Sequence, residues 1–372
     1  SVVIRTPAGF ASSPRHCARL SLRRQSALRL RHFYRYGDSP GVGQTFNAIG
    51  ADKQDGKSVA SLKQISLSDL ADEVVLVDGA YSTVNYKDGL AVAGAAPICQ
   101  VSPPGCGIDL AATVVESRDP AFSPGDRVLV NGYGLSERFN GGYSQKQRLK
   151  PEWLVRVPES MSLEETMAVG TAGYTSMLCV LALQDGGVTP ESGPVLVTGA
   201  AGGVGSVAVS LLSRLGYEVH ASTGRIDEAG QFLKDLGASA LVPRDELARD
   251  CKPLEKELWA GVVDTVGDKT LATAIAQTRY EGVVAACGLA GGMALPTSVM
   301  PFILRGVTLR GVDSVMAAQP RRQRAWDALA EQLDREHLKS IYEVVPLAAV
   351  PGLAKDIIAG AVRGRVVVDV NA

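Results

Sequence analysis

The pattern of hydrophobic and polar positions divides the chain into two parts with different periodicities. Between residues 46 and 158, the apolar runs FNAIGA, EVVLVDGAYSTVN, DRVLVNG and WLVRVP are separated by segments that contain turn residues, including DKQDGK. Short apolar runs bounded by Gly, Pro and Asp are typical of β-strands. We therefore expect this part of the chain to form a β-rich domain.

From about residue 162 onward, the pattern favours helices and strands in alternation. The segment 162–188 predicts a helix with Ser162 as its N-cap, Glu164 and Glu165 in its first turn, and Gly at its end. The strands PVLVTG, YEVHAST, LWAGVVDTVG, EGVVAACG and GVTLRGVDS then alternate with the helical segments GVGSVAVSLLSRLG, IDEAGQFLKDLGA and KTLATAIAQT. Such alternation predicts a parallel sheet covered on both faces, which is a doubly wound (Rossmann) domain.

Two segments complete the expected architecture. QPRRQRAWDALAEQLDREHL predicts one further helix, and the closing RGRVVVDV predicts a strand that returns to the first domain. The predicted fold class is α/β, with a β-rich catalytic domain over 45–167 and 343–372 and a nucleotide-binding domain over 168–342. A length of 372 residues allows each domain its own core.

The N-terminal 44 residues differ from the rest of the chain in charge. They hold eight Arg and one acidic residue, Asp38, which leaves 30 basic and 38 acidic residues, a net charge of −8, in 45–372. An Arg- and Ser-rich segment that is poor in acids is typical of a transit peptide. We expect residues 1–44 to be a mitochondrial transit peptide or a disordered extension. A plastid address and a basic nucleic-acid arm are the alternatives.

Charge, apolar stretches and cysteines argue against nucleic acid, a membrane span and an oxidising compartment. The acidic charge of residues 45–372 argues against nucleic acid as the main partner. The uncharged stretches 192–213 and 282–304 contain several Gly and Pro residues, which favours buried strands and turns over membrane spans. Six Cys without a tight pairing pattern favour a reducing compartment.

The segment VLVTGAAGGVGSVAVSLLSRLG carries the strongest functional signal. Ala200, Gly202 and Gly205 occupy the three small-residue positions of a G-x-G-x-x-G turn between an apolar strand and an apolar helix. Small residues allow a tight turn and close approach of the backbone to a pyrophosphate, which the helix N-terminus then binds. The turn predicts a dinucleotide cofactor.

The end of the next strand distinguishes NADP from NAD. An Asp or Glu there usually binds the ribose 2′-OH of NAD, whereas a 2′-phosphate needs hydroxyl groups and Arg. This chain has Thr223, Gly224 and Arg225 with no acid before Asp227, and Arg244 could supply a second guanidinium. We therefore expect NADP(H).

A β-rich domain followed by this nucleotide-binding domain resembles the medium-chain dehydrogenase/reductase superfamily, and the resemblance implies a GroES-like catalytic domain. Many of its members bind a catalytic zinc, but after residue 44 this chain has only His220 and His337 and no Cys cluster with zinc spacing. The segment GCGIDLAATVVE has no His where zinc-binding members carry ligands. We expect no metal site.

The resemblance is closer to the zinc-independent, quinone-oxidoreductase-like branch, and within it to the acryloyl-CoA reductase family. It rests on VNYKDGLAV, SPGDRVLVNGYGLSERFNGGYSQ, GTAGYTSMLCVLAL, TGAAGGVGS, AQTRYEGVVAACGLA, PFILRGVTLRGVDSVMA and RGRVVVDV, and covers about residues 46–372. One departure is PPGCGID, where family members usually have Pro-Gly-Ile-Asp.

The resemblance implies roles for residues that match the family. The implied contacts to the cofactor come from Tyr86, from the turn Ala201, Gly202, Gly203 and Val204, from Thr223, Gly224, Arg225 and Arg244, and from Leu289, Ile303 and Ser314. Thr171 could reach the cofactor or cap a helix. The resemblance also implies a homodimer, with GVTLRGVDS as the candidate edge strand.

The implied reaction is the NADPH-dependent reduction of the 2,3 double bond of a short enoyl-CoA, such as acryloyl-CoA. Tyr86 or water could donate the proton, because a phenol is neutral at pH 7. Asn85 could donate a hydrogen bond to the carbonyl, and Asp88 could orient Lys87, although capping a helix is the alternative for this trio.

Two questions stay open: which basic residues bind the CoA phosphates, and which class of substrate the protein reduces. Arg138, Lys146 and Arg148 are candidates for a basic CoA-binding rim, whereas a solvated helix face is expected for Arg321, Arg322 and Arg324. The alternative functions are an NADPH:quinone or 2-alkenal reductase and an NADPH-binding protein without turnover.

Overall fold

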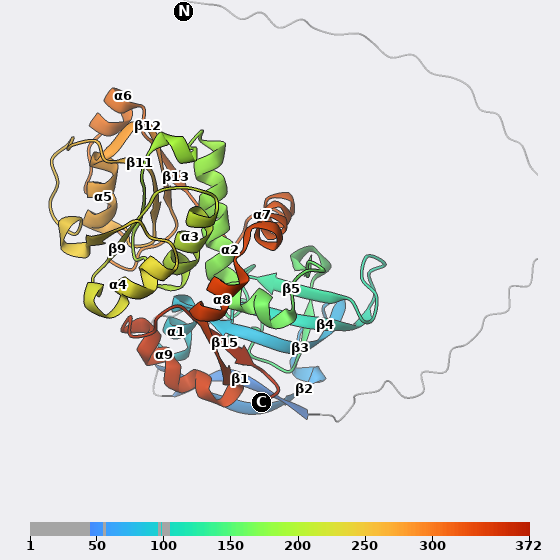
Figure 1. The fold of residues 1–372 in the computed structure, drawn as a ribbon. Helices are drawn as coiled ribbons and strands as arrows, with labels where there is room; N and C mark the ends of the chain where they lie inside the picture. The colour runs from blue at the N-terminus through green and yellow to red at the C-terminus, as the bar shows by residue number, and fades with distance from the viewer. Residues whose placement is uncertain (1–44, 55–56, 96–97, 99–104) are drawn as a thin grey trace, which may run out of the picture. The chain divides into compact units, whose positions relative to one another are not determined.

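The computed structural model describes residues 45–54, 57–95, 98 and 105–372, which form two sheets and a separate hairpin. Figure 1 shows the two sheets with helix α2 (Leu163–Asp185) between them. The expected targeting segment 1–44 lies outside the described residues.

One sheet has six parallel strands in the order β10-β9-β8-β11-β12-β13. Its strands are β8 Val195–Val197, β9 Val219–Thr223, β10 Ala240–Pro243, β11 Trp259–Asp264, β12 Thr278–Ala286 and β13 Thr308–Gly311. The strand order reverses between β8 and β11. In open α/β sheets, ligands bind at such a reversal, beyond the carboxyl ends of the strands.

Helices cover both faces of this sheet. Its strands contact α2, α3 Gly203–Arg214, α4 Ile226–Asp235, α5 Asp268–Ala276 and α6 Met300–Arg305. Helices α7 Gln319–Gln332 and α8 Arg335–Ile341 contact α2. Val195 and Val197 of β8 pack in the cluster that contains α2 and α3, whereas Leu196 packs in the cluster that contains α5. Alternate residues of a strand point to opposite faces. The prediction of a doubly wound domain is confirmed.

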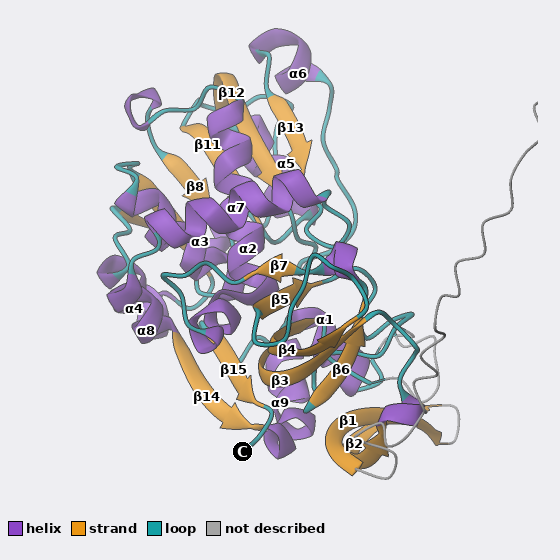
Figure 2. Cartoon of the chain, turned by 90° about the vertical axis from the view of Figure 1, so that its right-hand side faces the viewer, coloured by secondary structure: helices purple, strands orange, loops and turns teal. Residues whose placement is uncertain are grey.

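The second sheet has seven strands, with the order β14-β15-β3-β4-β5-β7 and β6 paired to the start of β3 (Figure 2). Its strands are β3 Val75–Val84, β4 Asp109–Ser117, β5 Arg127–Asn131, β6 Lys146–Leu149, β7 Val155–Arg156, β14 Tyr342–Pro346 and β15 Arg365–Asp369. Helices α1 (Tyr86–Val92) and α9 (Val350–Ile358) contact each other. β15 pairs with β3, so the prediction that the last strand returns to the first domain is confirmed.

The hairpin and the short helices complete the described chain. The antiparallel hairpin is formed by β1 (Thr45–Gln54) and β2 (Lys57–Ser66). The 3₁₀ helices are Leu67–Asp69, Pro151–Trp153, Pro190–Ser192, Arg244–Glu246 and Leu347–Ala349. The turn was expected over 52–57, but β1 continues to Gln54 and β2 begins at Lys57, so the turn is shorter than predicted. β2 was not predicted, since KSVASLKQIS lacks a regular alternation of apolar and polar residues.

Helix α2 begins as the sequence predicted. The amide of Glu165 donates to Ser162 Oγ (3.0 Å), and the Glu165 carboxylate accepts from the Ser162 amide (2.8 Å), which forms a capping box. Among the described helices, α2 alone is long and apolar enough to cross a membrane, but 89% of its most apolar window is buried inside the protein. It contacts strands of both sheets and is a core helix.

The helix predicted from residue 319 onward is two helices. Helix α7 ends at Gln332, and α8 begins at Arg335. The Asp334 carboxylate accepts from the amides of Glu336 and His337, both at 3.0 Å, and so caps α8. The break was not predicted because the cap lies inside a segment that otherwise favours a helix.

Candidate active site

The predicted phosphate turn connects β8 to α3 at the point where the strand order reverses. Gly202 is the N-cap of α3, and no side chain caps the first amides of this helix. A Cβ on Gly205 would come within 2.4 Å of the Gly199 carbonyl oxygen, so only glycine allows the helix to approach the turn this closely. Uncapped amides at a helix N-terminus form an anion-binding site.

The four residues predicted for the 2′-phosphate, Thr223, Gly224, Arg225 and Arg244, lie close together at the ends of β9 and β10. Thr223 is buried, and its hydroxyl accepts from the Arg225 amide at 3.2 Å. A Cβ built on Gly224 would come within 1.8 Å of Arg244 Nη2, so the Arg244 guanidinium lies directly over the Gly224 backbone. The structure therefore places the Arg225 backbone amide at this hydroxyl and the Arg244 guanidinium over the neighbouring Gly224.

A buried polar network lies at the end of β3, where the sequence had offered Asn85, Lys87 and Asp88 as candidates. Asn85 caps α1, and the Asp88 carboxylate accepts from the Asn85 amide (2.9 Å), the Asn85 side chain (3.0 Å) and the Ile108 amide (3.0 Å). The capping interpretation of Asn85 and Asp88 is confirmed. Because the Asn85 side-chain amide donates to two carboxylates, the hypothesis that it donates to a substrate carbonyl was wrong.

Asp109, the first residue of β4, is the centre of this network, and the sequence analysis missed it. Its carboxylate accepts from Asn85 Nδ2 (2.8 Å), Asn131 Nδ2 (2.7 Å), the Thr171 amide (2.9 Å) and the Thr171 hydroxyl. Asp109 thus connects β4 to β5, to α2 and to the N-terminus of α1. The Thr171 hydroxyl is directed to this carboxylate and does not cap a helix.

Arg365, the first residue of β15, is a second buried charge that the sequence analysis missed. Its guanidinium donates to Thr83 Oγ1 (2.7 Å) and to the carbonyls of Ala168 (3.2 Å) and Val84 (3.4 Å). A Cβ on Gly203 would lie 3.0 Å from Arg365 Nη1, so the guanidinium lies beside the first residue of α3. Arg365 connects the strand-rich sheet to the phosphate turn.

Burial shifts the pKa values of Asp88 and Arg365 in opposite directions. Burial, followed by repulsion from Asp109, raises the pKa of Asp88 to about 7, although hydrogen bonds from Asn85 and Ile108 lower it. Burial also lowers the pKa of Arg365, against the attraction of Asp109 and Asp88. Asp88 can therefore change its charge near neutral pH within a site that is closed to water.

Tyr86 is the first residue of α1 and, unlike Asn85 and Asp88, is exposed over 43% of its surface. Lys87 forms an ion pair with Glu137. Burial lowers the pKa of Lys87, and the nearby Asp88 and Asp313 oppose the shift. Of residues 85–88, Tyr86 has the side chain that is most exposed to a ligand.

The other predicted cofactor residues are less closely grouped. Leu289 follows β12 and is 58% exposed, and its Cα lies 3.4 Å from a Cβ built on Gly267. The Ser314 carbonyl accepts from Arg322 Nη2 at 3.2 Å. Ile303 is 70% exposed on α6, and no described contact connects it to the other predicted residues.

The basic residues considered for CoA occupy different places. Lys146 pairs with Asp78, and Arg148 approaches Asp72, which precedes β3. Both basic residues lie on β6, which pairs with the start of β3, far from Asn85 at its end. Arg138 lies close enough to Lys87 to influence its charge. Of these three residues, only Arg138 lies beside the trio at the end of β3.

Arg322 is not on a solvated helix face, as the sequence had suggested. It is buried, with its guanidinium 4.3 Å from the Tyr133 ring centre and 4.9 Å from the Tyr174 ring centre. It donates to the carbonyls of Asn131 (2.9 Å) and Val315 (3.3 Å). The expectation was wrong because aromatic rings far away in the sequence cover this face of α7.

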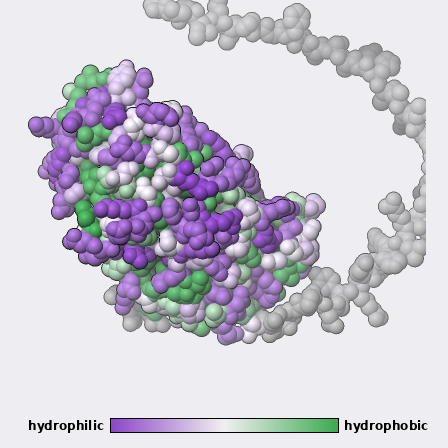
Figure 3. Space-filling model, in the orientation of Figure 1, coloured by the Kyte–Doolittle hydropathy of each residue, from purple (hydrophilic) through white to green (hydrophobic). Residues whose placement is uncertain are grey.

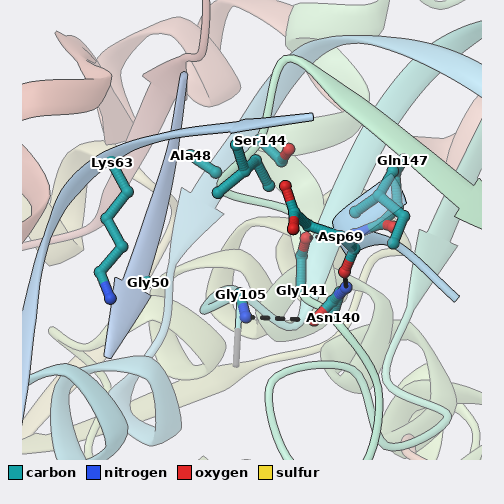
Figure 4. Close-up of a pocket in the computed structure, with 11 residues that line it drawn as sticks. Ala48, Gly50, Lys63, Asp69, Gly105, Asn140, Gly141, Ser144 and Gln147 are labelled. Carbon is teal, nitrogen blue, oxygen red and sulfur yellow. Dashed lines mark hydrogen bonds between the residues drawn. The ribbon is translucent and has the colours of Figure 1, made fainter. Parts of the chain in front are cut away.

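Two hollows lie away from these residues. Figure 4 shows a cavity of about 20 Å³ between the hairpin and the segment around Asn140, whose side chain accepts from the Gly105 amide at 3.4 Å. This volume fits about one water molecule. A wider hollow of about 370 Å³ lies beside Asp78 and Lys146. Neither is lined by a predicted cofactor residue.

The described residues do not fit a zinc site. They contain no group of three or more His, Cys, Asp or Glu side chains that could hold a metal ion. His220 contacts Glu218 Oε1 at 2.9 Å, and His337 Nδ1 lies 3.0 Å from the Ser210 hydroxyl. A catalytic zinc normally requires three protein ligands.

Comparisons with known proteins agree with this arrangement. Residues 203–331 match the zinc-binding dehydrogenase family. Acrylyl-CoA reductase AcuI from Ruegeria pomeroyi is 51% identical over 330 residues, which cover 88% of this chain and all of that protein. YhfP from Bacillus subtilis, whose name assigns it to the quinone oxidoreductases, is 44% identical and covers 87% of this chain and 98% of its own length.

A solved structure shows the same fold. The crystal structure of Escherichia coli K-12 YhdH with bound NADPH superposes with a TM-score of 0.85 at 48% sequence identity. The match covers 87% of this chain and all of that chain. The two sheets, the helix between them and the phosphate turn therefore belong to a known two-domain arrangement.

Proposed function

Because this chain belongs to the acrylyl-CoA reductase family, a zinc-independent branch of the medium-chain dehydrogenases/reductases with GroES-like and Rossmann domains, we propose that it reduces a short 2-enoyl-CoA with NADPH. The product of acryloyl-CoA would be propionyl-CoA. The observation that carries this proposal is the 51% identity along the entire length of acrylyl-CoA reductase AcuI.

The chain's residues fit the cofactor. The uncapped amides of α3 and the Ala201–Val204 backbone would hold the pyrophosphate, and Thr223, Arg225 and Arg244 would hold the 2′-phosphate. When bound, the cofactor supplies hydride to the β-carbon of the alkene. The protein's task is then to orient both partners and to place donors near the carbonyl oxygen, where charge develops.

The buried network orients this site. Asn85 and Asp88 fix the first turn of α1 and therefore the position of Tyr86, while Asp109 attaches the same turn to Thr171 of α2. Tyr86 would contact the cofactor and, as a neutral phenol, could give a proton to the α-carbon. Thr171, Leu289, Ile303 and Ser314 remain proposed contacts to the cofactor.

The test is a comparison of substrates. Residues 45–372 would be mixed with NADPH and, separately, with acryloyl-CoA, crotonyl-CoA, a quinone and a 2-alkenal, and NADPH oxidation would be followed at 340 nm. We expect the fastest oxidation with a short enoyl-CoA. Equal or faster oxidation with the quinone would overturn the proposal, and no oxidation with any of them would indicate a binding protein without turnover.

A quinone reductase is the second candidate, because the chain is 44% identical to YhfP. Both functions need the same cofactor-binding residues. Only a CoA substrate also needs basic residues that bind its phosphates. Arg138, next to Lys87, is the residue that would supply it near Tyr86.

A homodimer is the proposed assembly. β13 is the edge strand of the six-stranded sheet, and an unpaired edge can pair with another strand. Figure 3 shows hydrophobic surface around α6, where Val299, Ile303 and Leu304 are 66%, 70% and 54% exposed. An exposed apolar patch beside a free edge supports pairing across a two-fold axis.

We also propose that residues 1–44 direct the protein to the mitochondrion, with a plastid as the alternative. The support is their eight Arg and single acid. A fluorescent protein fused behind residues 1–44 should accumulate in mitochondria, and a diffuse cytosolic signal would contradict the proposal.

A further inference from the structure

The loop 359–364 connects α9 to β15 and touches the nucleotide-binding half at two points. The Gly364 amide donates to the Ala201 carbonyl at 3.4 Å, within the phosphate turn. Arg225 Nη1 donates to the Ala361 carbonyl at 3.5 Å, beside the residues proposed for the 2′-phosphate. A loop that the strand-rich half contributes therefore spans both phosphate-binding positions.

Arg363 lies between these two contacts and has an exposed side chain. Its guanidinium carbon is 4.9 Å from the ring centre of Phe232 on α4, the helix that Arg225 caps. A cation over an aromatic ring is held in place without losing its charge. Arg363 thus lies against α4, a helix that begins at the proposed 2′-phosphate position, although Phe232 is the seventh residue of that helix.

Three arginines in this region lack a carboxylate partner. Arg225, Arg244 and Arg363 form no ion pair with any described acidic residue, whereas Arg214, Arg249 and Arg335 of the neighbouring segments each do. A phosphate monoester carries nearly two negative charges and three acceptor oxygens, so it can bind more than two guanidinium groups.

We propose that Arg363 is a specificity-determining residue for the 2′-phosphate of NADP(H), which it would bind from loop 359–364 together with Arg225 and Arg244. The inference rests on the proposed function, because it assigns a third cation to the same cofactor. The motif Thr223–Arg225 at the end of β9 does not predict this residue, because Arg363 lies 138 residues after Arg225 in the chain. Binding of the phosphate would also attach this loop to the nucleotide-binding half.

The test measures binding without turnover. The full chain and the variants Arg363→Gln and Arg225→Gln would be titrated with NADPH, NADH, adenosine 2′,5′-bisphosphate and 5′-AMP by calorimetry. We expect Arg363→Gln to weaken binding of NADPH and of the bisphosphate about tenfold, with NADH and 5′-AMP changed less than twofold. Arg363→Lys should recover part of the loss.

The matched control is Arg214→Gln, which removes the same charge from α3 at an ion pair with Asp334. It should leave all four affinities unchanged. Equal weakening of NADPH and NADH by Arg363→Gln would assign Arg363 to packing on Phe232 and overturn the inference. Unchanged NADPH affinity would overturn it as well.

The two proposals fail in different ways. If Arg225→Gln weakens NADPH selectively but Arg363→Gln does not, the inference about Arg363 is wrong and the NADPH-dependent function stands. If the unmodified protein binds NADH as tightly as NADPH, the cofactor preference is wrong, and the role of Arg363 is overturned with it.

Discussion

Tyr86 differs from its neighbours by being accessible. It is 43% exposed at the start of α1, whereas Asn85 and Asp88 on either side are buried and bonded to each other. The network holds the backbone of the turn, and the phenol projects from it. Tyr86 is therefore free to contact a ligand, while Asn85 and Asp88 hold the backbone that positions it.

Tyr86→Phe tests the proton-donor role. Because the hydroxyl is lost and the ring is kept, we expect kcat for enoyl-CoA reduction to fall about a hundredfold, with the Kd of NADPH changed less than threefold. Stopped-flow kinetics and calorimetry measure the two quantities. Tyr280→Phe, at another exposed tyrosine, is the control and should change neither. An unchanged kcat with weaker NADPH binding would leave Tyr86 as a cofactor contact only.

Asp88 gives a pH-dependent prediction. Its pKa is about 7 in the folded protein because of burial and of Asp109, against about 4 in an unfolded chain. The folded state therefore binds the proton more tightly, and the stabilisation is complete below pH 4 and lost as the pH rises through 7. From pH 5 to pH 8, the free energy of unfolding should fall by on the order of 2 kcal/mol more than in Asp88→Asn.

Urea unfolding at several pH values measures this difference. Asp88→Asn also removes acceptor capacity from the cap, so its absolute stability should be lower, and the comparison concerns the slope with pH. Asp126→Asn is the control, because hydrogen bonds lower the pKa of this partly exposed carboxyl and place its titration below the tested range. Parallel pH profiles for the unmodified protein and Asp88→Asn would contradict the assignment.

Sites formed by residues that are neighbours in the sequence were predictable, whereas contacts between residues far apart in the sequence were not. The phosphate turn and the Thr223–Arg225 pattern are recognisable because each function depends on residues within a few positions. Asp109 meets Asn85, Asn131 and Thr171, which lie 22 to 62 residues away, and Arg365 meets Thr83 across 282 residues. No local pattern marks such partners before the chain is folded.

Among the elements, α2 connects the two halves through a kink. Gly170 lies inside the helix with φ 52° and ψ −163°, which interrupts the helix just before Thr171 reaches Asp109. The apolar segment predicted the helix and its cap, but not this kink, since glycine occurs in ordinary helices too. The kink depends on Arg365 and Thr83, which lie against it.

Gly170→Ala tests this element. A Cβ there would come within 2.6 Å of Arg365 Nη2 and of Thr83 Cγ2, and the positive φ would be strained. We expect a loss of about 2 to 4 kcal/mol in the free energy of unfolding. Gly352→Ala in α9, where a Cβ would meet nothing within 4 Å, is the control and should be nearly neutral. Equal effects of the two substitutions would refute the role of the kink.

On the scale of the whole molecule, the alternation of strands and helices was enough to predict two domains and a doubly wound sheet. The edges of the sheets are harder to predict, because edge strands such as β13 and β14 look like the paired strands beside them. Their exposed side chains distinguish them: Thr308 and Arg310 on β13 are exposed, and Val344 on β14 is 44% exposed. Val299, the residue before α6, is 66% exposed.

Val299→Asp and Val344→Asp therefore form a matched pair of tests for the assembly. Each adds one charge to an exposed valine near a sheet edge, so neither should unfold the protomer. If the β13 edge and the patch around α6 form the dimer, Val299→Asp should shift the sedimentation equilibrium from dimer to monomer, because the interface would bury an unpaired carboxylate. Val344→Asp should remain dimeric. Dissociation by Val344→Asp alone would place the interface at the β14 edge, and an unmodified protein that is monomeric at micromolar concentration would overturn the homodimer.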